Sequence, residues 1–511
     1  MNAFLLHVCA SFLIALPLGA GTLPNDFNGR FDTVTARRHL DVLASDDMRG
    51  RNTPSPELER AADYIADQFR SFGLEPLNGS YFHGYHLERM HLAEPTTLTI
   101  LKGRDTVHMA LKADFIPFEM SGTGNADIRN KRVVFAGFGI TVPEQQYDDY
   151  AGIDARDAVV LVMRGEPSSM RQHGSMTEKI RNARSHGAVA ILAVDAMRGR
   201  ALTVSGYPWP MLYPNLPKDA VPLMWTKPDV KLLPVFHVGE AVLKALVDSV
   251  GVLRGRCALI DSLCAPQSME LPGVRISCVV TFVRDSVPVR NVVGLLKGAV
   301  HPDEYVVMGA HYDHIGTGRP NEKGDSIFNG ADDNASGTAG LLMNAEAFAK
   351  GAARPDRSIL FIAFSAEERG LLGSKAYAAT PLLPLAKCVG MLNMDMIGRS
   401  ENGKLSIGGH LRCPDLIAIN EEENKAADRP FTLAYDIEAY FFRSDQASFA
   451  MKRIPVLFYF TGEHGDYHRQ GDEIAKINFA DLVRISSLAG RVAWRVAGSP
   501  RSTYLPAGWE D

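Results

Sequence analysis

Short apolar runs alternate with helical patterns between about residues 274 and 499, and this alternation constrains the fold more than any other feature. Each run has the length of a buried strand, and segments between them, such as Thr338 to Ala349, have the spacing of apolar residues expected of helices. The runs cover residues 305–308, 359–363, 389–392 and 456–459. The pattern predicts an α/β fold in which a mixed, mostly parallel sheet is covered by helices on both faces.

The composition is that of a globular protein and argues against two classes of partner. The chain has 511 residues, of which 46% are apolar and 22% are charged, and its formal net charge is -5. This length is enough for two or three domains with a large buried core. Acidic and basic residues are mixed along the chain, so we expect neither a nucleic-acid surface nor a basic membrane patch.

The N-terminus has features of an export signal. Residues 3–20 are apolar except for His7, Cys9 and Ser11, and a proline followed by small residues ends the run. This predicts a signal peptide over residues 1–21. Basic residues are missing before the run, and an uncleaved anchor on the outer face of the membrane is the alternative. We therefore expect an exported protein, periplasmic or extracellular, without stable membrane association after the signal is removed.

The remaining chain is predicted to form one α/β domain in two segments, 22–111 and 266–511, separated by an insert. In the first segment, Ser55 to Gly73 has an N-cap, a first-turn proline, an apolar stripe and a closing glycine, which together predict a helix. The insert, residues 112–265, contains short β runs separated by glycine and proline and one clear helix at 177–186. It lacks clustered acids and histidines with ligand spacing, so we expect a β-rich domain without catalytic residues.

Acidic residues and histidines recur directly after the apolar runs. In an α/β sheet, ligands bind outside the carboxyl ends of the strands, and charged side chains are costly to bury unless something pairs with them. A pair of divalent metal ions would provide that pairing. The positions are His311, Asp313, His314, Glu367, Glu368, Asp395, Asp466 and His468, with Asp332 and Asp333 at the start of a helix.

Each position alone also has an ordinary structural interpretation. Adjacent acids such as Glu367 and Glu368 often form solvated turns, and Asp332 with Asp333 could cap a helix. Together, however, two histidines and three carboxylates provide the ligands that zinc takes. One carboxylate can bridge two metal ions about 3.5–4 Å apart, as in hydrolysis by metal pairs. Glu367 is then left to act as a base.

These motifs resemble those of the zinc-dependent aminopeptidases with two co-catalytic metal ions. The matching segments occur in the family's order, and the insert resembles a protease-associated domain, so the resemblance covers nearly all of the chain after the signal. It implies the zinc exopeptidase fold, two Zn²⁺ ions per chain, and removal of N-terminal residues from peptides with a free N-terminus. The segments are Gly309 to Asp313, Asn329 to Gly337, Phe364 to Gly370, Asn393 to Gly398, and Asp466 to His468.

The resemblance also implies a role for each residue. By this resemblance His311 and Asp395 bind one ion, Glu368 and His468 bind the other, Asp332 bridges both, Glu367 is the general base and Tyr467 steadies the oxyanion.

Further expectations concern the neighbours of these residues. Asp313 and Asp472 could orient His311 and His468 as hydrogen-bond acceptors, and a cis peptide is expected between Asp332 and the acid that follows it.

Three further positions are not expected to bind metal. His314 and His464 lie near the ligand positions in sequence and are predicted to be pocket or structural residues. The segment Arg443 to Gln446 resembles another site-lining motif of the family, but Gln446 stands where the family commonly has histidine, which argues against a binding role for this loop.

Several other functions remain open from the sequence. A carboxypeptidase or dipeptidase of the same fold would share the metal site and differ only in the substrate pocket. A receptor on an inactive peptidase scaffold would be a different class of protein, but such relatives lose ligands, and all five ligand positions are filled here. A glutaminyl-cyclase-like transferase is a further alternative, which the insert and the full ligand set for a second metal argue against.

Overall fold

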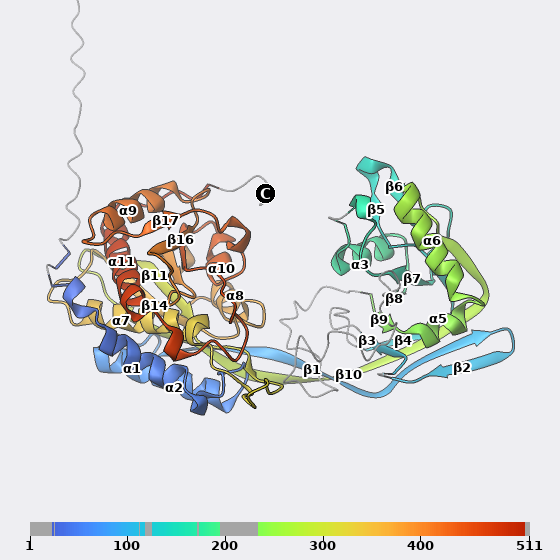
Figure 1. The fold of residues 1–511 in the computed structure, drawn as a ribbon, viewed down its shortest axis with the longest axis horizontal. Coiled ribbons are helices and arrows are strands. Elements are labelled where there is room, and N and C mark those ends of the chain that lie inside the picture. Colours follow the sequence, from blue (N-terminus) through green and yellow to red (C-terminus); the bar gives the residue numbers. More distant parts are fainter. Residues whose placement is uncertain are drawn as a thin grey trace, which may run out of the picture. The chain divides into compact units, whose positions relative to one another are not determined.

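The computed structural model describes residues 23–505 apart from residue 25, residue 112 and segments 118–124, 171–172 and 195–232. The predicted signal at residues 1–21 lies outside the described residues. The chain forms two compact units, Met1–His86 with Pro288–Asp511, and Leu87–Val287 (Figure 1). In the described part of the chain, no helix combines the length and the apolar character needed to cross a bilayer.

The first unit contains a mixed sheet with strand order β17-β16-β18-β15-β11-β14-β10. Neighbouring strands run parallel from β18 through β15 and β11 to β14, whereas β10 pairs with β14 and β16 pairs with β18 in antiparallel fashion. The predicted mixed, mostly parallel sheet is therefore confirmed. The strands are β10 (Met269–Leu296), β11 (His301–His311), β14 (Arg357–Phe364), β15 (Cys388–Met394), β16 (Lys404–Gly408), β17 (Thr432–Ala434) and β18 (Val456–Phe460), with a small separate pair, β12 (Gly316–Thr317) and β13 (Ile327–Phe328).

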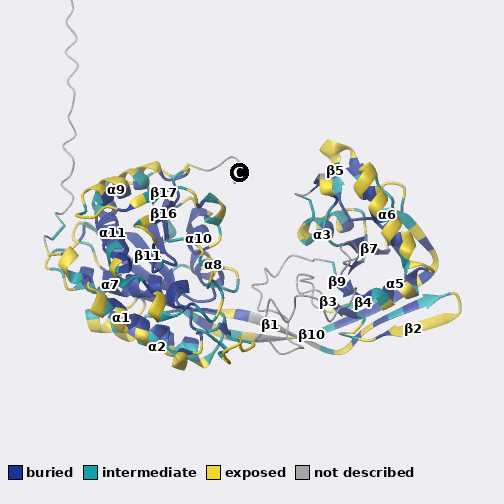
Figure 2. Cartoon of the chain, viewed as in Figure 1, coloured by how far each residue is buried: buried dark blue, intermediate teal, exposed yellow. Residues whose placement is uncertain are grey.

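Helices cover both faces of this sheet. On β15, Gly390 faces Val496 of α11, whereas the Asn393 side chain, which points to the opposite face, donates a hydrogen bond to Gln446 of α10. The apolar runs of the central strands are accordingly buried (Figure 2), which explains why they are continuous in the sequence. The helices of this unit are α1 (Thr33–Leu43), α2 (Pro56–Phe72), α7 (Gly337–Ala349), α8 (Leu372–Ala379), α9 (Pro414–Lys425), α10 (Gln446–Ala450) and α11 (Phe479–Gly498).

The helix predicted from Ser55 to Gly73 is confirmed as α2. The Ser55 side chain accepts a hydrogen bond from the Leu58 amide, and Pro56 occupies the first helical position. Gly73 ends the helix with a φ of 85°, which a residue with a side chain adopts only at a cost. The apolar stripe predicted for this helix is buried, and packing of α2 against α7 places it over the sheet.

The second unit, Leu87–Val287, is wider than the predicted insert and contains helices as well as strands. Its core includes Leu98 and Ile100 before residue 112 and Ile276 and Val280 after residue 265, because the β1–β2 hairpin and part of β10 pack onto it. Strands β4, β7, β8 and β9 run parallel, and helix α3 lies between β7 and β8 in sequence. Its identity as a protease-associated domain stays a prediction.

The elements of this unit and its connecting strand are β1 (Phe82–Lys102), β2 (Asp105–Met109), β3 (Phe115–Pro117), β4 (Ala126–Phe135), β5 (Thr141–Val142), β6 (Tyr147–Asp148), β7 (Val159–Met163), α3 (Met176–Ser185), β8 (Ala190–Val194), β9 (Val235–Val238), α5 (Glu240–Leu246) and α6 (Val250–Leu263).

Candidate metal centre

The residues singled out from the sequence meet at one edge of the first unit's sheet. His311 is the last residue of β11, the paired acids Glu367 and Glu368 follow β14, Asp395 follows β15, and His468 lies in the loop after β18. Because these strands are parallel, their carboxyl ends lie at the same edge and bring the side chains together. The placement of the site at the strand ends is as predicted.

Asp333 lies between the two histidines. One carboxylate oxygen is 3.4 Å from His311 Nε2, and the other is 3.1 Å from His468 Nε2. Each histidine also faces an acid of its own: His311 Nε2 is 3.4 Å from Asp395 Oδ1, and His468 Nε2 is 3.1 Å from Glu368 Oε2. The arrangement thus consists of two half-sites that share one carboxylate.

The position between the histidines was predicted for Asp332, and the structure corrects it. The carboxylate of Asp332 points elsewhere: Oδ1 accepts a hydrogen bond from the Gly398 amide at 2.6 Å, and Oδ2 lies 3.3 Å from His464 Nε2. The backbone of Asp333 leaves the helical conformation, with φ −103° and ψ 96°, and this turns its side chain towards the histidines. The cis peptide is correspondingly one residue later than predicted, between Asp333 and Asn334.

The turn that carries Asp333 is η7 (Ala331–Ser336). Asn334 ties η7 to the end of β15, because its side chain donates to the Met394 carbonyl and accepts from the Met396 amide. Gly337 follows, and a Cβ there would lie 2.3 Å from the Met394 carbonyl oxygen. Glycine therefore permits the close approach of α7 to β15 that brings Asp333 beside Asp395.

Two predicted orienting residues act differently from expectation. Asp472 accepts hydrogen bonds from the backbone amides of Asp332 and Asp333, both at 3.0 Å, and therefore fixes the η7 turn and not the ring of His468. The ring of His311 is held by the backbone carbonyl of Asp313, 3.1 Å from Nδ1, while the Asp313 carboxylate accepts from the Glu367 amide at 3.0 Å. Both acids therefore accept hydrogen bonds from backbone amides and hold in place the loops that carry the site.

His314 and His464 lie outside the pair of histidines that share Asp333. His314 is fully buried, and its Nδ1 lies 2.8 Å from Glu368 Oε1, the oxygen of Glu368 that does not face His468. Its Nδ1 is also 3.7 Å from Asp333 Oδ2, so the His314 ring lies directly beside the centre. Ligand atoms of His314, Asp333 and Glu368 lie within 4.8 Å of one another, so His314 is also within reach of an ion held by these two acids.

Charge at the site is strongly negative and raises the proton affinity of the histidines. Burial acts to lower the pKa of His468, but Glu368 and Asp333 outweigh it and raise that pKa to about 11. Burial also acts to lower the pKa of His311, but Glu367 and Asp395 outweigh it and raise that pKa well above its usual value. Such a site favours cations, and a metal ion can replace the protons on these nitrogens.

The donor set and its spacing fit zinc. Two ligand atoms about 2.1 Å from a tetrahedral zinc ion lie about 3.4 Å apart, and the four nitrogen–oxygen pairs around Asp333 measure 3.1–3.4 Å. Asp395 Oδ1 and His468 Nε2 are buried and make no hydrogen bond to another protein group, which leaves them available as ligands. Ligand atoms of His311, Glu367 and Asp395 lie within 4.8 Å of one another.

Glu367 occupies the mouth of the site. Its carboxylate lies 3.9 Å from His311 Nε2 and lines the adjoining pocket. Burial, together with the neighbouring Glu368 and Asp395, raises the pKa of Glu367 well above its usual value, although His311 opposes this. Glu367 therefore combines access to the pocket with a high proton affinity, as expected of a general base.

The pocket beside the centre is open to solvent, and its wall combines charged groups with the aromatic rings of Tyr440, Phe458, Phe460 and Tyr467. Tyr467 stacks on the ring of His468, with the ring centroids 3.9 Å apart, and burial raises the pKa of the Tyr467 hydroxyl, which keeps the phenol protonated. Gln446 is buried, and its amide group is bonded to Asn393 and the Phe441 carbonyl, whereas Arg443 and Ser444 of the same loop line the pocket. The pocket is lined by His311, Asp333, Glu367, Asp395, Met396, Tyr440, Arg443, Ser444, Phe458, Phe460, Glu463 and Tyr467.

Residues 291–493, which include every residue of the centre, match peptidase family M28. The first unit therefore resembles an M28 peptidase. The match begins near the end of β10 and ends within α11, so it contains strands β11 to β18 and helices α7 to α10, whereas α1 and α2 lie before it.

Individual relatives are named as probable zinc metalloproteases. A protein from Pyrenophora teres f. teres named a probable zinc metalloprotease is 39% identical over 115 residues, which are 22% of this chain and 24% of the relative. A probable zinc metalloprotease from Pyricularia oryzae is 28% identical over 264 residues, covering 42% of this chain and 52% of the relative. The chain thus spans about half, or less, of the length of these relatives.

A solved structure extends the likeness of fold to the second unit. The aminopeptidase from Aneurinibacillus sp. strain AM-1 is 22% identical, and the similarity covers 94% of this chain and 98% of that protein, with a TM-score of 0.57. Both units therefore have counterparts in a protein of the same general architecture.

Proposed function

We propose that this chain is an active aminopeptidase with two zinc ions. The observation that carries the proposal is the Asp333 carboxylate, whose two oxygens face two different histidines, each of which faces an acid of its own. A carboxylate shared in this way is the arrangement expected of a bridging ligand in a two-metal hydrolase. The similarity to proteins named as probable zinc metalloproteases and the donor chemistry favour zinc.

Five residues would hold the two ions. His311 and Asp395 would bind one, His468 and Glu368 the other, and Asp333 both. Zinc pairs polarise a substrate carbonyl and lower the pKa of bound water towards neutrality.

The protein's own groups would move the protons and steady the developing charge. Glu367 accepts the proton of the attacking water and later donates it to the leaving amine. The Tyr467 hydroxyl, which stays protonated, donates a hydrogen bond to the oxyanion that forms at the scissile carbonyl. Asp313 fixes the Glu367 backbone and therefore the approach of the base.

Removal of N-terminal residues follows from the charge around the pocket. Glu367, Asp395 and Asp333 line it from the side of the centre, and a substrate α-ammonium group is stabilised by these carboxylates. A carboxypeptidase would instead need a cation at this depth to bind a terminal carboxylate. The Arg443 guanidinium lines the pocket but is about half exposed and is paired with Glu463 at 3.2 Å.

Chelation is expected to abolish hydrolysis, because no protein group replaces the ions as a Lewis acid. The purified chain should contain two zinc ions by elemental analysis and hydrolyse aminoacyl anilides with a free N-terminus. Treatment with a chelator should remove both the ions and the activity, and added Zn²⁺ should restore both. Equal hydrolysis of N-blocked peptides, or release of C-terminal residues, would contradict the aminopeptidase assignment.

The apolar wall of the pocket predicts a preference for large apolar N-terminal residues. Met396, Phe458 and Phe460 are buried and belong to one apolar cluster with Ile437. Burying a leucine side chain stabilises a complex by about 1.5–3 kcal/mol, so kcat/KM for a leucine anilide should exceed that for a glycine anilide at least about tenfold. A panel of anilides measures this ratio, and a preference for glycine or for aspartate would contradict it.

A further inference from the structure

A short segment that is distant from the site in sequence lies against the loops that form it. Gly50–Thr53, here termed the brace, runs between η2 (Asp46–Met48) and α2. Gly50 and Arg51 have φ values of 69° and 45°, in the left-handed region. A Cβ at Gly50 would lie 2.3 Å from the carbonyl oxygen of Phe328, so glycine is needed for the close approach of the brace to this chain segment.

The Arg51 side chain holds two of the site loops through their backbone oxygens. It is fully buried, and its Nε donates to the carbonyl of Tyr312 at 2.9 Å, in the loop after β11. Its two NH groups donate to the carbonyls of Asn329 at 2.8 Å and Gly330 at 3.1 Å, directly before η7, and to that of Leu43. A planar guanidinium with fixed donors sets the spacing of these carbonyls in a way that a lysine ammonium cannot.

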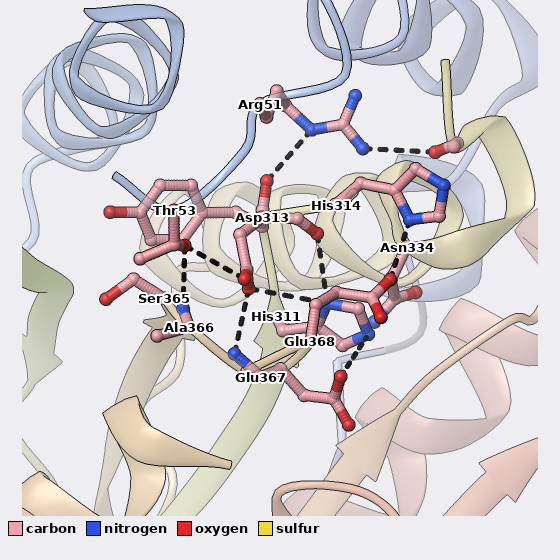
Figure 3. A network of polar contacts seen from close by, with 12 residues as sticks. Arg51, Thr53, His311, Asp313, His314, Asn334, Ser365, Ala366, Glu367 and Glu368 are labelled. Atoms are coloured by element: carbon pink, nitrogen blue, oxygen red, sulfur yellow. Dashed lines mark hydrogen bonds and ion pairs between the residues drawn. The ribbon is translucent and has the colours of Figure 1, made fainter. Parts of the chain in front are cut away.

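Thr53 extends the same contacts to the third loop. Its hydroxyl donates to Asp313 Oδ2 at 2.9 Å and accepts from the Ala366 amide at 3.2 Å. The other oxygen of the same carboxylate accepts from the Glu367 amide at 3.0 Å. Figure 3 shows this chain of contacts passing from Thr53 through Asp313 to the loop of the paired acids.

The charge of Arg51 also suits its position. Burial lowers the pKa of Arg51 to about 10, while Asp313, Asp333 and Asp472 act to raise it, so the guanidinium stays protonated at neutral pH. Its hydrogen bonds go to carbonyls. The positive charge therefore offsets part of the repulsion among the buried acids without occupying a carboxylate that a metal ion needs.

We propose that Arg51 and Thr53 are positioning residues of the metal centre, which hold the loops after β11, before η7 and after β14 at the spacing that sets Asp333 between His311 and His468. This inference rests on the proposed two-zinc function. The brace acts on the ligands before any ion binds, so its removal should weaken zinc binding and not only activity.

The first test is Arg51→Lys, which keeps the positive charge and removes the planar set of NH donors that bind the backbone carbonyls of the site loops. Zinc affinity is measured by competition with a chromophoric chelator, on protein whose folding is checked by circular dichroism. The zinc Kd of at least one site should rise about 10- to 100-fold, the range seen when groups that orient metal ligands are removed. The matched control is Arg491→Lys, in which another buried arginine, bonded to Glu423 and Asn28, is changed. Its zinc Kd should change less than about twofold.

The second variant, Thr53→Val, keeps the shape of the side chain and removes only the hydroxyl, so it decides the question if Arg51→Lys does not fold. Its zinc affinity should fall, and kcat should fall about tenfold or more with little change in KM, because the loop of Glu367 loses its anchor. Unchanged zinc affinity in folded Arg51→Lys or in Thr53→Val, or an equal loss in Arg491→Lys, would overturn the inference. Absence of zinc binding by the parent protein would instead overturn the proposed function.

Discussion

A Glu367→Gln variant is expected to retain both zinc ions and to hydrolyse peptides about 10²–10⁴-fold more slowly than the parent. Glutamine has nearly the same shape, but its amide cannot accept the proton of the attacking water. The Glu367 carboxylate lies 3.9 Å from His311 Nε2 and lines the substrate pocket, so this loss should appear in kcat. The measurement is steady-state kinetics on a leucine anilide together with elemental analysis of zinc.

The neighbouring acid provides the contrast. Glu368 Oε2 faces His468 at 3.1 Å, and its other oxygen lies 2.8 Å from His314 Nδ1, so Glu368→Gln should lose zinc as well as activity. Two adjacent glutamates would then differ in which property they control. Full activity of Glu367→Gln, or loss of zinc from it, would show that Glu367 is not a base that acts beside the ions.

The strands that carry the site could be predicted because they are buried on both faces. β11, β14, β15 and β18 therefore read as short continuous apolar runs, and their helical connections have helical spacing. β10 gave no such signal. It contains Pro272, Gly273 and Pro288, residues that usually end a strand. Pro272 and Gly273 lie in a bulge of β10, which is visible as a register shift between Leu271 and Arg275 in the pairing of β10 with β4.

The sequence predicted the motifs that form the site but not the orientation of every side chain within them. Asp332 and Asp333 have the same chemistry and sequence context, and which of them faces the histidines depends on the non-helical backbone of Asp333 within η7. No periodicity encodes that rotation. Arg51 and Thr53 were missed for a different reason. They act on backbone groups more than 250 residues away, and an arginine that binds carbonyls needs no matching acid in the sequence.

Replacing Asp333 or Asp332 by asparagine should show which of the two is the bridging ligand and which has only a structural role. Asp333→Asn removes one of two donor oxygens and the negative charge between His311 and His468. Loss of groups that only orient ligands costs about 10- to 100-fold, so loss of the shared ligand should lower zinc affinity and activity at least about 100-fold. Zinc content should fall below two ions per chain, as measured by elemental analysis after dialysis.

Asp332→Asn is the matched change one residue earlier. An asparagine there can still accept the hydrogen bond from the Gly398 amide, so both zinc ions should remain. The cost should be one of stability, about 1–3 kcal/mol in the free energy of unfolding, because the contact with His464 is weakened in a fully buried place. The reverse result, with zinc lost from Asp332→Asn and kept by Asp333→Asn, would return the bridging position to Asp332. That result would also require η7 to rotate when zinc binds, because in this structure the Asp332 carboxylate points away from His311 and His468.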